Sequence, residues 1–327
     1  GMDVNNFIGA DRFYGAGYTG GSTITANVEA GHIWGDAAGH ETLTHVTSYT
    51  TGTGASGAID RHATWCGMVI GGRRGGSSQG EWQTGVARNT DLRSGAIATG
   101  WNGNAYSLSF SITGDSYLST YDAYFGTANV INSSWGYGGD EGGTSWYSVA
   151  IDALIRANSS TTQVASAGNS GPGSNTVGGA GAAYNAITVG ALGSANGFDA
   201  IAGFSSRGPQ DYEDATNGTI AGVRAAVDIA APGASLTSAY YGGQTGGNDS
   251  SLTGSPSGDL GDVDYYSVSI QGTSFAAPIV AGGAALLNDA SIGEGLGADS
   301  RNSRVIKAVL LNSADKPTGW DNGQADS

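Results

Sequence analysis

The sequence is poor in cysteine, in lysine and in long apolar runs, and each shortage excludes a class of protein. Its one cysteine, Cys66, allows no internal disulfide framework and no multi-cysteine metal site. Lysine occurs only as Lys307 and Lys316, and the formal net charge is −15 at pH 7. A nucleic-acid partner is therefore excluded, because neutralising phosphates requires clustered cations. No apolar run reaches the roughly 18 residues of a membrane helix, so we expect no membrane span.

The 327 residues are 39% hydrophobic, which is enough for one large core. We expect a single domain over residues 1–327, because no repeat, linker or shift in composition divides the chain. Short β-branched runs alternate with helical segments, which predicts a parallel sheet covered on both faces, a three-layer α/β/α fold. The expected strands are 22–31, 127–136, 161–169, 185–192 and 225–233, and the expected helices are 62–72, 145–158, 274–290 and 303–314.

The stretch GTSFAAP, residues 272–278, puts Ser274 at the start of a helix. The free N–H groups of a first helical turn favour a developing negative charge, which suits a nucleophile. We expect Pro278 in the first turn of this helix, where a missing N–H costs little. A Thr-Ser pair before a helix is more often a simple N-cap, however, so the assignment depends on other segments.

Four segments, in the order acid, His, Asn, Ser, resemble those of the subtilisin-like serine proteases. GTSFAAP matches the family's G-T-S-x-A-x-P at every fixed position, and HATWCGM (62–68) keeps the His and Thr of H-G-T-H-V/C-A-G. ASAGNSG (165–171) is similar to A-A-G-N-x-G. The resemblance implies Ser274 as nucleophile, His62 as base and Asn169 as oxyanion donor beside the Ser274 backbone N–H. The His segment departs from the family motif at Ala63 and Trp65, which replace a Gly and a second His.

The acid position also departs from the family, because ANVEAG (26–31) has Glu29 where D-[ST]-G has Asp. Glu is one methylene longer, so the strand or the His must shift by about 1 Å. The nearest Asp, Asp36, falls past the turn by the family pattern, and Glu29 is favoured as the acid that orients His62. The neighbouring sedolisin family is excluded, since the helix keeps His62 and the oxyanion position is Asn.

Two other functions stay open at this point. A weakened triad would leave a subtilisin-like protein that binds peptides without efficient turnover. The second alternative is an esterase-like hydrolase with weak peptidase activity.

Two further segments carry the expected substrate contacts. NSSWG (132–136) resembles the strand that pairs with the substrate backbone, which implies contacts at Ser134, Trp135 and Gly136. Residues 176–191 align with the family's pocket loop, which implies Gly178 at the pocket floor and Ala167 and Gly168 on a wall. A glycine floor implies a deep, uncharged slot for a large apolar side chain, although Ala180 replaces a frequent proline. Cys66, one turn after His62, is expected to be a packed thiol beneath the imidazole.

The resemblance implies protein or peptide substrates, secretion, and no required organic cofactor. Many relatives bind structural calcium, and oxygen-ligand chemistry makes four aspartates candidates here, although solvated loop carboxylates are the simpler interpretation: Asp249, Asp259, Asp262 and Asp264. They fall in or beside 241–262, a polar stretch that we expect to be a surface loop. By comparison with the family, we expect the pro-segment to be missing from this chain and the family's last helix to lie beyond it. We therefore expect a truncated or nicked end, with its own pro-segment or C-terminal fragment as candidate partners.

Overall fold

The computed structural model describes residues 3–74, 84–104, 107–136, 139, 142–241 and 266–316. At its centre is a seven-stranded sheet in which all neighbouring strands run parallel. Across the sheet the strands are β11 (Ile229–Pro232), β8 (Ile187–Leu192), β7 (Thr162–Ser166), β6 (Val130–Ser133), β1 (Ile24–Glu29), β3 (Asp91–Ala96) and β2 (Ser48–Thr51). All five strands expected from the sequence are present, each shorter than its apolar run suggested.

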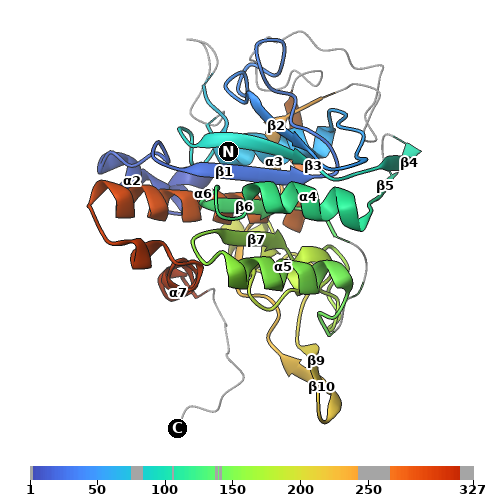
Figure 1. The fold of residues 1–327 in the computed structure, drawn as a ribbon. Coiled ribbons are helices and arrows are strands. Elements are labelled where there is room, and N and C mark those ends of the chain that lie inside the picture. Colours follow the sequence, from blue (N-terminus) through green and yellow to red (C-terminus); the bar gives the residue numbers. More distant parts are fainter. Residues whose placement is uncertain are drawn as a thin grey trace.

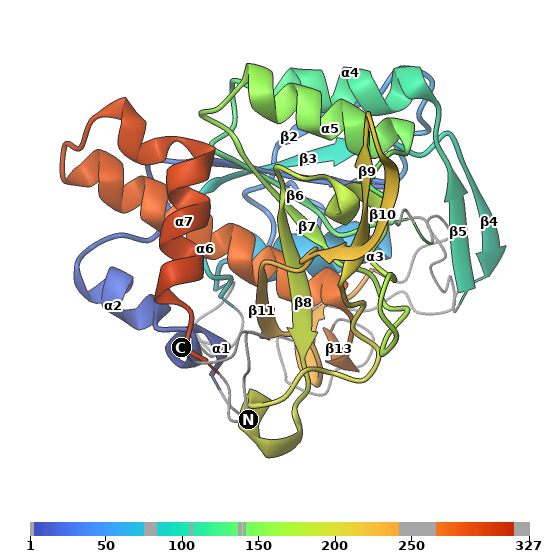
Figure 2. The same cartoon turned by 90° about the horizontal axis from the view of Figure 1, so that it is seen from below.

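Helices cover both faces of this sheet, as the alternation of strands and helices predicted (Figure 2). On one face lie α4 (Gly114–Tyr124) and α5 (Trp146–Ala157), and on the other lie α3 (Arg61–Gly71) and α6 (Thr273–Gly293). A separate apolar cluster fills the space on each side of the sheet. The fold is therefore a three-layer α/β/α arrangement.

The remaining elements lie around these layers. Three antiparallel pairs join β4 (Gly100–Asn104) to β5 (Ser107–Ser111), β9 (Gln210–Asp214) to β10 (Gly218–Arg224) and β12 (Leu236–Ala239) to β13 (Tyr266–Ile270). The β9–β10 hairpin projects from the body of the molecule at the bottom of Figure 1. The other helices are α1 (Val4–Phe7), α2 (Ala10–Gly15) and α7 (Ser303–Ser313), with the 3-10 helices η2 (Gly179–Ala182), η3 (Ala195–Phe198) and η4 (Ala298–Arg301).

Helix α6 is the central helix of the fold. It is long and apolar enough to cross a membrane, but most of its length is buried and it packs against α3 and five strands of the sheet. Its small residues allow this close packing, since a Cβ on Gly282 would lie only 2.5 Å from Val86 Cβ. These contacts identify α6 as a core helix.

The start of α6 corrects one expectation. The helix begins at Thr273, so Pro278 lies in its second turn rather than its first. Proline has no N–H, and the carbonyl of Ser274, four residues earlier, therefore loses its helical hydrogen-bond donor.

Candidate active site

The site forms where several strands end and two helices begin. Helix α3 follows Asp60, whose carboxylate accepts the backbone N–H of His62 at 3.1 Å and that of Ala63 at 3.4 Å. Burial raises the pKa of Asp60 to about 6, an effect that nearby His62 reduces. The sequence interpretation missed Asp60, although an Asp just before a helix is a common N-cap. It fixes the backbone from which His62 projects.

Glu29, the last residue of β1, contacts the imidazole of His62. Its Oε2 atom lies 3.0 Å from His62 Nδ1, and its Oε1 atom accepts the backbone N–H of Ser134 at 2.9 Å. Glu29 is 1% exposed, so water competes little for these contacts. Asp36 lies in an exposed turn, where its carboxylate accepts the N–H of Ala38. Of the two acids that the sequence offered, Glu29 is the one that contacts His62.

The surroundings of His62 act on its pKa in opposite directions. Burial lowers the pKa, while the Glu29 carboxylate raises it by its charge and its hydrogen bond. The direct contact with Glu29 leaves the pKa of His62 above its ordinary value of 6.5. Burial raises the pKa of Cys66 to about 11, so this side chain is a neutral thiol at ordinary pH.

Ser274 is the second residue of α6 and lies two residues after Gly272, whose φ of +152° is a conformation that side-chain-bearing residues rarely adopt. The Ser274 hydroxyl donates to the carbonyl of Ser134 at 3.0 Å. Cys66 lies between the two helices, with Sγ at 3.3 Å from the Ser274 carbonyl oxygen and 3.8 Å from His62 Nδ1. Ser274 and His62 therefore flank the same thiol.

Asn169 lies just after β7 and is held by the residue that precedes Ser274. Its Oδ1 atom accepts both the backbone N–H of Thr273 at 2.9 Å and the Thr273 hydroxyl at 3.0 Å. The Thr273 hydroxyl also accepts the N–H of Gly168 at 3.1 Å. With Oδ1 occupied in this way, the amide nitrogen of the exposed Asn169 side chain is the group left to donate to a ligand.

A buried pair of amides lies beneath these residues and was not predicted. Asn132 Nδ2 donates to Asn27 Oδ1 at 2.8 Å and to the Ser134 hydroxyl at 2.9 Å, and Asn27 Nδ2 donates to the carbonyl of Ala63 at 3.1 Å. Both asparagines are fully buried. They connect β1, β6 and α3 directly below the contact between Glu29 and His62.

The expected substrate-contact residues divide into an accessible rim and a buried floor. Gly136 is exposed and Gly168 is half-buried, whereas Ala167 and Gly178 are buried. Trp135 is also buried, and its Nε1 donates to the Tyr121 hydroxyl at 3.2 Å, so the ring is not available to a substrate.

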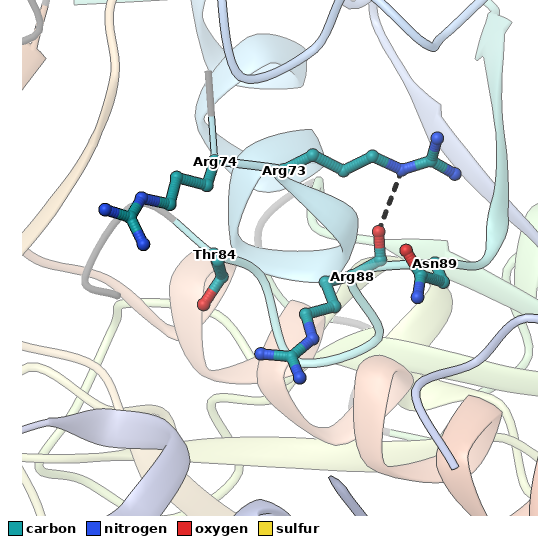
Figure 3. A pocket seen from close by; sticks show the side chains of 5 residues that line it. All are labelled: Arg73, Arg74, Thr84, Arg88 and Asn89. Carbon is teal, nitrogen blue, oxygen red and sulfur yellow. Dashed lines mark hydrogen bonds between the residues drawn. The ribbon is translucent and has the colours of Figure 1, made fainter. Parts of the chain in front are cut away.

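Among the described residues, the ligand atoms of Glu29, His62 and Cys66 lie within 4.8 Å of one another. Such donors suit zinc, but an ion bound at Nδ1 would replace the contact between His62 and Glu29. The aspartates considered for calcium, at positions 249, 259, 262 and 264, lie outside the described residues. A cavity of about 240 Å³ is lined by Arg73, Arg74, Thr84, Arg88 and Asn89 (Figure 3). Arg73 and Arg74 follow the end of α3, whereas His62 lies at its start.

Comparisons with known proteins concern the family and the fold of this chain. A model of the subtilase family matches residues 25–325. The structure is similar to that of the prenylagaramide maturation protease PagA, with a TM-score of 0.65 and 22% sequence identity, covering 94% of this chain and 88% of that one. It is also similar to sphericase, with a TM-score of 0.59 and 24% identity, covering 90% of this chain and 85% of that one. At these identities the structural likeness concerns the fold.

Proposed function

This chain belongs to the subtilase family of serine endopeptidases, and we propose that it hydrolyses peptide bonds with Ser274 as nucleophile, His62 as base, Glu29 as the orienting acid and Asn169 as oxyanion donor. The observation that carries this assignment is the pair of contacts made by Glu29. One carboxylate oxygen meets His62 Nδ1 at 3.0 Å, and the other is fixed by the backbone of Ser134. An acid held on both sides in this way can fix the tautomer of the imidazole and stabilise the imidazolium.

The reaction follows from these positions. The substrate lies extended along residues 134–136 and adds a strand through main-chain hydrogen bonds. His62 Nε2 takes the proton of Ser274 as Oγ attacks the scissile carbonyl, and the Asn169 amide and the Ser274 N–H donate to the resulting oxyanion. His62 then gives this proton to the leaving amine, and water hydrolyses the acyl-enzyme by the same steps.

In the structure without substrate, the Ser274 hydroxyl donates to the Ser134 carbonyl. The incoming substrate N–H competes for this carbonyl, which frees the hydroxyl to turn towards His62. Catalytic hydrogen bonds that form only in the substrate complex are common in hydrolases.

That same hydrogen bond favours a second candidate function. If the Ser274 hydroxyl stays on the Ser134 carbonyl, the groove binds peptides without efficient turnover. An aryl phosphonate diester separates the two functions, because Ser274 Oγ must displace a phenoxide from phosphorus, while His62 accepts the hydroxyl proton. We expect the intact mass of the protein to increase by one phosphonyl group. Ser274→Ala should abolish this increase, and His62→Ala should suppress it. An unmodified wild-type chain would instead support the binding function.

Relative rates on matched ester and amide substrates test the esterase alternative, since a peptidase must cleave the amide efficiently. Secretion and a structural calcium ion are further predictions from the family resemblance. Calcium can be tested by the change in melting temperature on adding a chelator.

A further inference from the structure

The recess beside the nucleophile has an accessible rim but a filled interior. Gly136 and Asn169 are exposed at the rim. Immediately below them, Ala167, Gly178 and Gly179 are buried. Solvent would reach the floor and inner wall of an open, deep slot, so this burial favours a recess that ends close to its rim.

Backbone contacts of η2 account for this filling. Gly179 has a φ of +62°, and a Cβ built on it would lie 2.5 Å from Gly136 Cα and 3.0 Å from the carbonyl oxygen of Trp135. On the other side, a Cβ on Gly181 would lie 2.4 Å from the carbonyl oxygen of Ser166. These distances leave no room for any side chain, so η2 is wedged between the segment that follows β6 and the end of β7.

The floor is joined to the second wall as well. The N–H of Gly178 donates to the carbonyl of Ala167 at 3.3 Å, and its own carbonyl oxygen would lie 3.7 Å from a Cβ on Gly136. Gly178 is therefore bonded to the Ala167 wall, and the space between it and Gly136 holds about one methyl group. Backbone therefore narrows the deep slot that the family's pocket loop implied.

The wedge is anchored by side chains from three other elements. Each of them donates to a carbonyl of η2: Ser148 Oγ to Gly179 at 3.1 Å, Thr188 Oγ1 to Gly181 at 2.7 Å and Arg224 Nη1 to Ala182 at 2.7 Å. The Arg224 guanidinium also lies over the Tyr184 ring, 4.3 Å from its centroid. Moving η2 to admit a larger group would break these hydrogen bonds together.

The position of this recess makes it a determinant of specificity. The Ser274 hydroxyl donates to the carbonyl of Ser134, two residues before Gly136, and the exposed Asn169 directly follows Gly168. The side chain of the substrate residue just before the cleaved bond must therefore enter between Gly136 and Gly168. We infer that the protease cleaves after residues with small side chains, glycine, alanine or serine, and rejects large apolar and aromatic ones. This inference rests on the proposed function of Ser274.

A matched pair of phosphonates tests the inference with the whole 327-residue chain. The two probes carry the same peptide arm and leaving groups, and differ only in a methyl or a benzyl group on the carbon next to phosphorus. We expect the methyl probe to modify Ser274 at least about 100-fold faster, since a tight pocket discriminates strongly against an oversized group. Equal rates, or faster labelling by the benzyl probe, would overturn the inference while supporting the proposed function. Labelling by neither probe would overturn both.

Gly136→Ala gives an independent test. Its added methyl would lie 3.6–3.7 Å from Gly178 and Gly179, which is ordinary contact, so the variant should fold. The methyl fills what remains of the recess. We expect labelling by the methyl probe to slow about 10-fold, while a probe with hydrogen at this carbon is affected little. Gly114→Ala, at a glycine with open space around it, is the control that should change neither rate. Equal slowing of both probes by Gly136→Ala would contradict the inferred recess.

The anchors of η2 provide a third test. Ser148→Ala and Arg224→Ala each remove one hydrogen bond that holds the wedge. We expect the ratio of methyl to benzyl labelling rates to fall in both variants. A purely structural role would lower the two rates in proportion, and an unchanged ratio would overturn the assignment of these residues as positioning residues for the recess.

Discussion

The thiol of Cys66 donates to the carbonyl oxygen of Ser274 across 3.3 Å. That carbonyl needs a donor because Pro278 cannot supply the usual helical N–H. Burial raises the pKa of Cys66 to about 11, which keeps the sulfur protonated and able to donate. The cysteine beneath the imidazole therefore stabilises the first turn of the helix that carries the nucleophile.

Cys66→Ala should destabilise the protein and reduce kcat. It leaves the buried Ser274 carbonyl without a donor, which costs about 1–3 kcal/mol in the free energy of unfolding. Cys66→Ser, which retains a donor, should recover most of this loss. Urea unfolding and steady-state kinetics on one peptide substrate measure both effects, and equal stability of the Ala and Ser variants would argue against the hydrogen bond.

Asn169→Ala should lower kcat about 100- to 1,000-fold, because an oxyanion donor contributes about 2.7–4 kcal/mol to transition-state stabilisation. Thr273→Val should lower kcat by a smaller factor with little change in KM, since it removes the hydroxyl that holds Asn169 Oδ1 at 3.0 Å. Thr273→Ser is the control and should behave like wild type. Unchanged kcat in Thr273→Val would show that the backbone N–H of Thr273 is sufficient to orient Asn169.

The pH dependence of kcat/KM should have an acidic limb above pH 6.5. His62 must be neutral to accept the Ser274 proton, and contact with Glu29 leaves the pKa of His62 above its ordinary value. Activity is therefore lost as pH falls through this raised pKa. A midpoint at or below 6.5, on matched ester and amide substrates, would mean that Glu29 does not raise the pKa of His62.

Asp60 should make the protein less stable as the pH rises from about 4 to about 6. Its pKa of about 6 in the folded protein exceeds the ordinary 3.8, so the folded state binds the proton more tightly than the unfolded state. Ionisation then lowers the free energy of unfolding, by up to about 3 kcal/mol. Asp60→Asn keeps a capping oxygen and should remove this pH dependence. Urea unfolding at pH 4 and pH 8 measures how the free energy of unfolding changes with pH, in a Ser274→Ala background that prevents self-cleavage. An equal change with and without Asp60→Asn would contradict the account.

The sequence predicted the parts of the fold and site that depend on local patterns. Apolar β-branched runs marked five of the seven central strands, and helix-start motifs marked His62 and Ser274. The hairpin of β9 and β10 was missed, because its residues are mostly exposed and lack a buried face that would give a periodic pattern. The depth of the recess could not be predicted either. It depends on the approach of Gly179 to Gly136, two residues far apart in sequence that carry no side chain.

The central claim is that Glu29 orients His62 in place of the usual aspartate. The most direct test compares kcat/KM of Glu29→Gln with that of Asp36→Asn on one peptide substrate. The account predicts a loss of about 1,000-fold or more for Glu29→Gln, on the scale of other triad acids, and nearly wild-type activity for Asp36→Asn. Retained activity in Glu29→Gln, or a comparable loss in Asp36→Asn, would contradict it.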